Sequence, residues 1–297
     1  MRELDGYKRH IRDCIGFQVK TAAAKRLFAL ALAFALALPL VVLVAIPAPA
    51  GAQATTPAED RAALRLPDLR MGPLQDLKIR RLPDGRRLLR FSALMVNVGA
   101  GPFEVHGQRP NTDTPTLPVT QRIYDSAGNP HDHTTDAHMF YSGDGHDHWH
   151  IADLERYKLK RLGGSGQVRE GAKQGFCVYD FYPYNLTLRG APKNKHYTAG
   201  NTCGLPAHEE ALQVDMGLSV GWVDKYGYYL PLQWIDITGL RSGTYRLYAV
   251  ADAEDQFEEQ REANNYTWDK IELKPNKAKV LKEGPVARYC GRNGRYC

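Results

Sequence analysis

Residues 87–98 read Arg-Leu-Leu-Arg-Phe-Ser-Ala-Leu-Met-Val-Asn-Val, and this stretch decides the class of fold. Apolar side chains stand at every second position within it: Leu89, Phe91, Ala93 and Met95. Successive side chains of a β-strand point to opposite faces, so the alternation places these four on one face of a strand. Residues 99–102 (Gly-Ala-Gly-Pro) end the run. We therefore predict a strand followed by a turn.

Short segments of the same kind recur along the chain. They are rich in β-branched and aromatic residues, are bounded by Gly, Pro, Asn or Asp, and span residues 120–124, 151–162, 176–179, 230–237, 244–250 and 266–273. Long stretches with helical periodicity are missing after residue 52. Many short strands separated by turn signals predict a mainly β domain over residues 66–273, an antiparallel β-sandwich with long loops.

The N-terminal segment, residues 1–52, has the pattern of an export signal. Residues 27–46 are almost entirely apolar, two basic residues precede them, and a small-residue exit ending Ala-Gly-Ala follows. This order is typical of a secretory signal peptide. An apolar run of this length is also long enough to span a bilayer, so an N-terminal membrane anchor is the alternative. Both predict a secreted or extracytoplasmic protein, with residues 53–65 as a polar linker.

The net charge of +6 is unevenly distributed. Residues 1–52 contain seven Lys/Arg and three Asp/Glu, and residues 274–297 contain seven Lys/Arg and one Glu, which leaves the body with about −4. Binding to nucleic acid needs a basic surface, so the body is not expected to bind it. The basic C-terminal tail, 274–297, and the N-terminal segment each offer a means of attachment to the cell envelope. The alternative for the tail is a solvated extension.

The cysteines are consistent with export. Cys14 precedes the apolar run, and the other four form an even set: Cys177, Cys203, Cys290 and Cys297. In an oxidising compartment, four cysteines allow three disulfide connectivities. Proximity in sequence favours Cys177–Cys203 and Cys290–Cys297. A cysteine zinc site is the competing interpretation, but no C-x-x-C spacing supports it.

The stretch that carries chemistry is His146-Asp147-His148-Trp149-His150. Three of the chain's ten histidines alternate here, so on a strand they share one face while Trp149 falls on the other. Neutral imidazole binds Cu, Zn, Ni and Fe, and three imidazoles from one strand fill most of a coordination sphere. We predict a metal site at His146, His148 and His150, with a solvated histidine run as the alternative.

The histidine stretch, with the acidic Asp153 three residues after it, resembles the copper-binding segment of lysyl oxidases. Glu-Gly-Ala-Lys-Gln-Gly-Phe-Cys at 170–177 is similar to the segment that holds the cofactor lysine of that family. Residues 217–227, Gly-Leu-Ser-Val-Gly-Trp-Val-Asp-Lys-Tyr-Gly, are similar to the segment that holds its cofactor tyrosine. The stretches at 87–99, 233–238 and 243–265 fit the family in the same order. The resemblance covers roughly residues 66–273, and an ordered set of motifs is specific where one motif would be weak.

The resemblance implies a copper-dependent enzyme with a lysyl-oxidase-like catalytic domain. It places the Cu(II) ligands at His146, His148 and His150, and the cofactor lysyl tyrosylquinone at Lys173 and Tyr226. Family members oxidise primary amines, including protein lysines, to aldehydes with O2, and they release H2O2 and ammonia. The quinone supplies an electrophile that ordinary side chains lack.

Asp153 is the third predicted catalytic residue. A carboxylate this close to the metal strand could remove the α-proton of the substrate amine, and capping or pairing with an arginine is the alternative. The chain departs from the animal pattern, because Gly143 and Tyr157 stand where further histidines would be and at most two disulfides can form. The sparse cysteines and the Ala-rich leader favour a bacterial member.

A second histidine group comprises His131, His133 and His138. It has no counterpart in the resemblance. A second metal site, a supplement to the first site and an exposed loop are the three interpretations, and we predict the loop.

Two other functions compete with amine oxidation. A non-catalytic exported copper-binding or adhesive β-sandwich module would keep the fold without forming the quinone, and the presence of both Lys173 and Tyr226 favours the enzyme. A zinc hydrolase would pair an open three-histidine zinc with Glu155 as base, but the flanking motifs argue against it. We therefore predict a primary-amine or protein-lysine substrate, O2 as co-substrate and no nucleic-acid partner.

Overall fold

A computed structural model describes residues 64–142, 147–163, 166, 168–204 and 208–286. The chain divides into two compact units, and the one at Lys20–Ala63 lies outside the described residues. The predicted signal segment, Cys14, Cys290 and Cys297 lie outside them too. Within the described ranges, no helix has the length and apolar character needed to cross a membrane.

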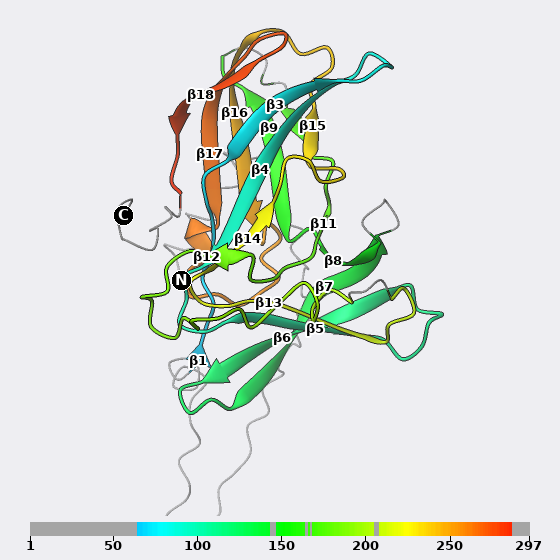
Figure 1. The fold of residues 1–297 in the computed structure, drawn as a ribbon, viewed down its shortest axis with the longest axis vertical. Helices are drawn as coiled ribbons and strands as arrows, with labels where there is room; N and C mark the ends of the chain where they lie inside the picture. The colour runs from blue at the N-terminus through cyan, green and yellow to red at the C-terminus, as the bar shows by residue number, and fades with distance from the viewer. Residues whose placement is uncertain (1–63, 143–146, 164–165, 167, 205–207, 287–297) are drawn as a thin grey trace, which may run out of the picture. The chain divides into compact units, whose positions relative to one another are not determined.

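The described chain is built from three antiparallel sheets (Figure 1). The seven-stranded sheet has the order β11-β8-β7-β6-β5-β13, with β1 beside β6. Its strands are β1 (Leu64–Arg65), β5 (Phe103–Gln108), β6 (Thr116–Asp125), β7 (Pro130–Ser142), β8 (His148–Ala152), β11 (Gly175–Phe176) and β13 (Gln213–Leu218). This arrangement confirms the predicted mainly β, antiparallel class.

The other two sheets face each other. The six-stranded sheet has the order β12-β14-β4-β15 with β2 and β3 also on β4, and the five-stranded sheet has the order β10-β9-β16-β17-β18. The strands of the first are β2 (Leu69–Met71), β3 (Gln75–Arg81), β4 (Arg87–Asn97), β12 (Tyr182–Pro183), β14 (Trp222–Tyr226) and β15 (Trp234–Asp236). Those of the second are β9 (Glu155–Arg161), β10 (Val168–Glu170), β16 (Gly243–Ala251), β17 (Tyr266–Leu273) and β18 (Ala278–Glu283). A single 3-10 turn, η1 (Glu262–Asn264), precedes β17 among the described residues.

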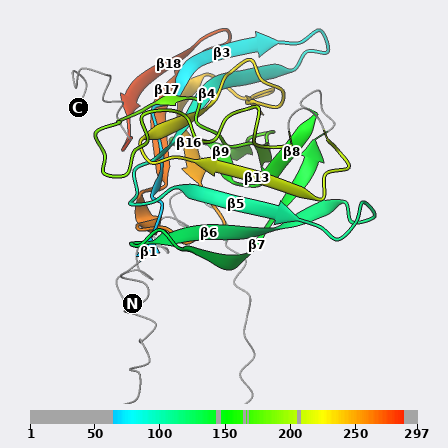
Figure 2. The same ribbon diagram turned by 60° about the horizontal axis from the view of Figure 1, so that its bottom comes forward.

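The core lies where β2 of the six-stranded sheet contacts β16 and β17 of the five-stranded sheet. Phe91 and Met95 of β4 and Tyr245 and Leu247 of β16 are fully buried there. Burying large side chains of this kind contributes about 1.5–3 kcal/mol each to folding. Figure 2 shows β13, β5, β6 and β7 of the seven-stranded sheet. This sheet extends the same core with Phe103 and other buried side chains. The predicted two-sheet sandwich therefore describes only part of the fold. The seven-stranded sheet was not predicted.

The stretch at 87–98 forms β4, as predicted, and its alternating side chains are fully buried. The opposite face of β4 is covered as well, because Leu94 and Val96 pack with Val223 and Tyr184. β17 spans the predicted 266–273, and β16 contains the predicted 244–250.

Residues 151–162, predicted as one strand, form parts of two. β8 ends at Ala152 and β9 begins at Glu155. Asp153 between them has φ 55°, in the left-handed region that aspartate tolerates better than most residues. Its backbone N–H donates to the carbonyl of Gln174 (2.7 Å), so the bend is held by a segment distant in sequence.

Two further expectations need correction. His131, His133 and His138 lie on β7 and not in a loop, because β7 pairs with β6 along this stretch. The first part of the predicted tail, 278–283, is β18 and pairs with β17, so it belongs to the five-stranded sheet. Polar side chains hid both strands from a search for alternating apolar residues. β18 is an edge strand, which needs few apolar residues, and the side chains of residues 130–136 in β7 are exposed or half-buried.

Candidate active site

Two of the three predicted metal ligands lie on β8. His150 is buried and His148 is half-buried, and their ring centroids are 4.4 Å apart with the planes at 70°. Residues i and i+2 of a strand share a face, which is why both imidazoles point to the same side. The third predicted ligand, His146, lies outside the described residues.

Trp149 fixes the strand from its opposite face. Its side chain is fully buried, its indole N–H donates to the carbonyl of His208 (2.7 Å), and the guanidinium of Arg109 lies 4.9 Å from its ring centroid. This packing on the reverse face agrees with the alternation in the sequence. His148 and His150 therefore lie on a strand whose opposite face is fixed by the packing of Trp149.

The short strand β11 carries the candidate cofactor lysine to the histidine strand. Gly175 pairs with Ala152 of β8, and Lys173 stands two residues before Gly175. A Cβ at position 175 would lie 2.5 Å from the ring of Phe140 and 2.8 Å from the Cβ of His150, so only glycine allows this close approach. Lys173 is itself buried, with 3% of its surface exposed.

Tyr226, at the end of β14, lies beside Lys173. The ammonium Nζ of Lys173 is 5.0 Å from the centroid of the Tyr226 ring and 5.5 Å from that of Phe176. The Phe176 and Tyr226 rings are themselves 5.0 Å apart in an edge-on arrangement. Two residues 53 positions apart in the sequence are therefore adjacent in the fold.

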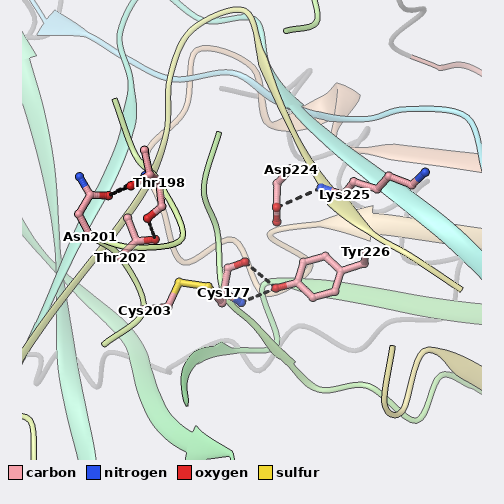
Figure 3. Close-up of a disulfide and its surroundings, with 8 residues drawn as sticks. All are labelled: Cys177, Thr198, Asn201, Thr202, Cys203, Asp224, Lys225 and Tyr226. Atoms are coloured by element: carbon pink, nitrogen blue, oxygen red, sulfur yellow. Dashed lines mark hydrogen bonds between the residues drawn. A yellow bond between two sulfur atoms is a disulfide. The ribbon is translucent and has the colours of Figure 1, made fainter. Parts of the chain in front are cut away.

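The Tyr226 hydroxyl is held at both its donor and acceptor sites by the backbone of Cys177. It donates to the Cys177 carbonyl at 2.6 Å and accepts from the Cys177 N–H (Figure 3). Burial, followed by the nearby Asp224 and Glu155, raises the pKa of the Tyr226 hydroxyl well above its ordinary value. The phenol is thus neutral and fixed in orientation.

The disulfide Cys177–Cys203 connects these parts, and it is the pairing that sequence proximity favoured (Figure 3). The backbone N–H of Trp149 donates to the carbonyl of Cys203 (3.1 Å). The histidine strand is therefore linked to the Tyr226 hydroxyl through the backbone of Cys203, the disulfide and the backbone of Cys177.

Replacing both Cys177 and Cys203 with alanine is expected to lower the free energy of unfolding by about 3–4 kcal/mol, because the bridge closes a loop across 26 positions. Denaturant unfolding measures the loss. A reducing agent should destabilise the unaltered chain by a similar amount and leave the double variant unchanged. Equal stability of the two chains would show that the bridge does not hold the fold together.

Two buried carboxyls flank the Lys173–Tyr226 pair. Burial raises the pKa of Glu155 to about 7, while a hydrogen bond from the Tyr157 hydroxyl (2.6 Å) and the charge of Lys173 oppose the rise. Burial and the charge of Glu155 raise the pKa of Asp224 well above its ordinary value. Both side chains are at most 1% exposed. The site thus combines one buried cation with two interacting buried acids.

Asp153 has a different environment from these two acids. Its carboxylate is paired with the guanidinium of Arg156 (3.1 Å), its side chain is 38% exposed, and Arg156 also contacts Glu254. Pairing with an arginine is the alternative that the sequence left open for this residue.

The second histidine group does not gather. His131 contacts Asp125 at 3.2 Å, and His133 contacts Glu258 at 3.4 Å. In the described part of the chain, the groups close enough to share an ion are instead Asp252, Glu259 and Glu262, whose oxygens lie within 4.8 Å of one another. That set is purely carboxylate and differs from the imidazole chemistry of β8.

A histidine strand, an adjacent buried lysine and a tyrosine against that lysine are joined in one site by short strands and a disulfide. The sequence profile of the lysyl oxidase family matches residues 111–282, more than half of the chain. The chain belongs to the lysyl oxidase family. The match includes β18, so the family domain extends beyond residue 273 into the predicted tail.

Curated relatives of this lysyl oxidase family member match it over 181 residues. The chain is 28% identical to lysyl oxidase homolog 3B of Danio rerio over 181 residues, which is 61% of this chain and 17% of that protein. It is 26% identical to lysyl oxidase homolog 2 of Homo sapiens and 27% identical to lysyl oxidase homolog 4 of Mus musculus over the same length. The matched region spans less than a fifth of each of these relatives.

Sequence reasoning missed the buried acids of this lysyl oxidase family site. Glu155 was considered only as a zinc-hydrolase base, and Asp224 only as part of a motif. A signal was present, because Glu155 alternates with Tyr157 and Leu159 on the buried face of β9. An acidic residue at an apolar position of an alternating strand indicates a buried ionisable group with a role.

Proposed function

We propose that this chain is an exported copper-dependent amine oxidase. It converts primary amines, protein lysines among them, to aldehydes with O2, and it releases H2O2 and ammonia. One observation carries the proposal: the amine of Lys173 lies 5.0 Å from the ring centroid of Tyr226 in a buried site. These are the two residue types from which the family's lysyl tyrosylquinone is made, and here they are already adjacent.

The imidazoles of His146, His148 and His150 would hold Cu(II). The donor set fits, because His148 and His150 present their rings to one side of β8 within 4.4 Å of each other. Copper stands at the top of the divalent affinity order for such nitrogen ligands, and zinc is the next candidate. Export into an oxidising compartment agrees with both the copper and the disulfide.

Lysyl tyrosylquinone, once formed from Lys173 and Tyr226, supplies the electrophilic carbonyl that a primary amine can condense with. The side chains around the pair prepare that chemistry. The Cys177 backbone fixes the orientation of the Tyr226 ring through its hydroxyl. Phe176 packs edge-on against the Tyr226 ring, Tyr157 packs against Phe176 in turn, and the Tyr226 side chain is buried away from water. Exclusion of water strengthens every charge interaction within such a site.

The route to the cell envelope belongs to segments outside the described residues. Residues 1–52 would direct export as a cleaved signal or remain as an anchor, and the end of the basic tail would bind anionic envelope polymer. The substrate would then be a surface amine or an exposed protein lysine.

The test is to express the chain from residue 53 onward, load it with copper in air, and measure peroxide released by n-butylamine and by a lysine-containing peptide. We expect amine-dependent peroxide and ammonia in equal amounts from the copper-loaded chain and none from the zinc-loaded chain. Full copper loading without peroxide from either amine would contradict the proposal and leave the copper-binding module as the function.

A further inference from the structure

Glu155 is the most deeply buried ionisable group near the Lys173–Tyr226 pair. Its side chain is 0% exposed. One carboxylate oxygen accepts a hydrogen bond from the Tyr157 hydroxyl (2.6 Å), and the other, Oε1, is buried without a hydrogen-bond partner. A buried oxygen left without a donor costs about 1–3 kcal/mol. Oε1 is free to accept a proton.

The fold places Glu155 close enough for charge interactions with both members of the pair. The backbone N–H of Gly171 donates to the Tyr157 carbonyl (2.8 Å). This hydrogen bond holds the segment that contains Lys173 beside β9. The Tyr157 ring is 6.0 Å from Phe176, which in turn contacts Tyr226. Charge interactions agree with this placement, because Lys173 acts on the pKa of Glu155 and Glu155 acts on that of Tyr226.

The two buried acids are not equivalent. Burial raises the pKa of Asp224 well above its ordinary value, and its Oδ1 accepts a hydrogen bond from the backbone N–H of Lys225 (3.0 Å). Glu155 instead accepts a hydrogen bond from the Tyr157 side chain, and burial raises its pKa to about 7, so that its carboxylate form is available near neutral pH. Two neighbouring buried acids with raised pKa values are typical of a site of proton transfer.

Asp153, the base predicted from the sequence, is less suited to this role than Glu155. Its charge is already paired with Arg156 and its side chain is partly exposed to water.

We propose that Glu155 is the catalytic base that removes the α-proton of the amine substrate. This assignment rests on the proposed function. In the step, the α-carbon–hydrogen bond breaks and the proton goes to Oε1 of Glu155. The quinone formed from Lys173 and Tyr226 would accept the electron pair of that bond, and O2 would be the final two-electron acceptor, giving H2O2 with two protons. Water would release the carbon of the substrate as aldehyde and its nitrogen as ammonia, and Glu155 returns its proton to solvent.

The variant that tests this is Glu155→Gln in the copper-loaded chain matured in air. The amide can still accept the Tyr157 hydroxyl but cannot take up a proton. We expect kcat/KM for n-butylamine to fall by about 10²–10⁴-fold. Copper content, the Lys173–Tyr226 cross-link seen by mass spectrometry, and the coloured adduct with phenylhydrazine should all remain, because none of these needs the α-proton to move.

Asp269→Asn is the matched control. Asp269 of β17 is a fully buried carboxyl whose pKa burial also raises to about 7, with only Glu283 as a further cause. Its replacement removes a similar buried acid outside the site. We expect kcat/KM within about twofold of the unaltered chain.

The pH profile gives a second readout. Because Glu155 must lose its proton to act, kcat/KM calculated on the neutral form of n-butylamine should rise with pH and level off above an inflection near pH 7. Lys173, Asp224, Tyr157 and Tyr226 are the other ionisable groups facing it, and burial raises the pKa of the three acids among them above their ordinary values. The Glu155→Gln variant should lose the inflection.

Four results would overturn the assignment. An unaltered chain that forms no cross-link would remove the proposed function and this role together. A cross-linked Glu155→Gln variant with unchanged kcat/KM would remove Glu155 alone, and a selective loss in Asp153→Asn would give the role to Asp153. A Glu155→Gln chain that fails to cross-link would place Glu155 in cofactor formation and not in substrate oxidation.

Discussion

Lys173→Met is expected to abolish amine-dependent peroxide release, down to the level of the copper-free chain. The methionine side chain matches the length and apolar stem of lysine but has no amine to join to the Tyr226 ring, so the cofactor cannot form. Copper content should be unchanged, because Lys173 stands on the segment before β11 and the imidazoles stand on β8. Peroxide assay and metal analysis of the same preparation measure the two effects.

Lys225→Met is the matched control. Lys225 is the neighbour of Tyr226 on β14, and its side chain points away from the Tyr226 ring (Figure 3). The loss of one positive charge from the same strand should leave peroxide release within about twofold of the unaltered chain. Activity that survives in Lys173→Met would show that another amine, or none, takes part in the chemistry.

His148→Ala should abolish copper uptake and amine-dependent peroxide release together. His148 shares its strand face with His150, and the loss of one imidazole from a three-imidazole set removes both affinity and geometry. Equilibrium dialysis with Cu(II), followed by metal analysis, gives the stoichiometry. His131→Ala is the control, because His131 of β7 contacts Asp125 at the end of β6.

Stoichiometric copper in His148→Ala would place the metal elsewhere in the chain. Loss of copper in His131→Ala as well would indicate that the second histidine group contributes to the same site.

The sequence predicted the fold class because its strongest signals are local. Alternation in 87–98 and in 266–273 needs only neighbouring residues, and β4 and β17 formed where it indicated. The third sheet could not be predicted in the same way. At one end of this sheet β8 pairs with β11. β11 is only two residues long, which is too short for any periodic signal.

The site was predicted in its residue types but not in its arrangement. The histidine alternation and the family motifs singled out His148, His150, Lys173 and Tyr226, yet the distance between the last two depends on tertiary contacts. In those contacts, Gly175 packs closely against β8, and the Cys177 backbone forms hydrogen bonds with the Tyr226 hydroxyl. Glu155 escaped notice because burial, and not its residue type, gives it an unusual pKa.

Peptide mapping of the air-matured, copper-loaded chain is the most direct test of the central claim. Because the amine of Lys173 lies against the ring of Tyr226, digestion should yield one cross-linked peptide that contains both residues and stains for quinone. The same digest from chain kept with zinc should yield two separate, unmodified peptides. Separate and unmodified Lys173 and Tyr226 peptides from fully copper-loaded chain would contradict the account.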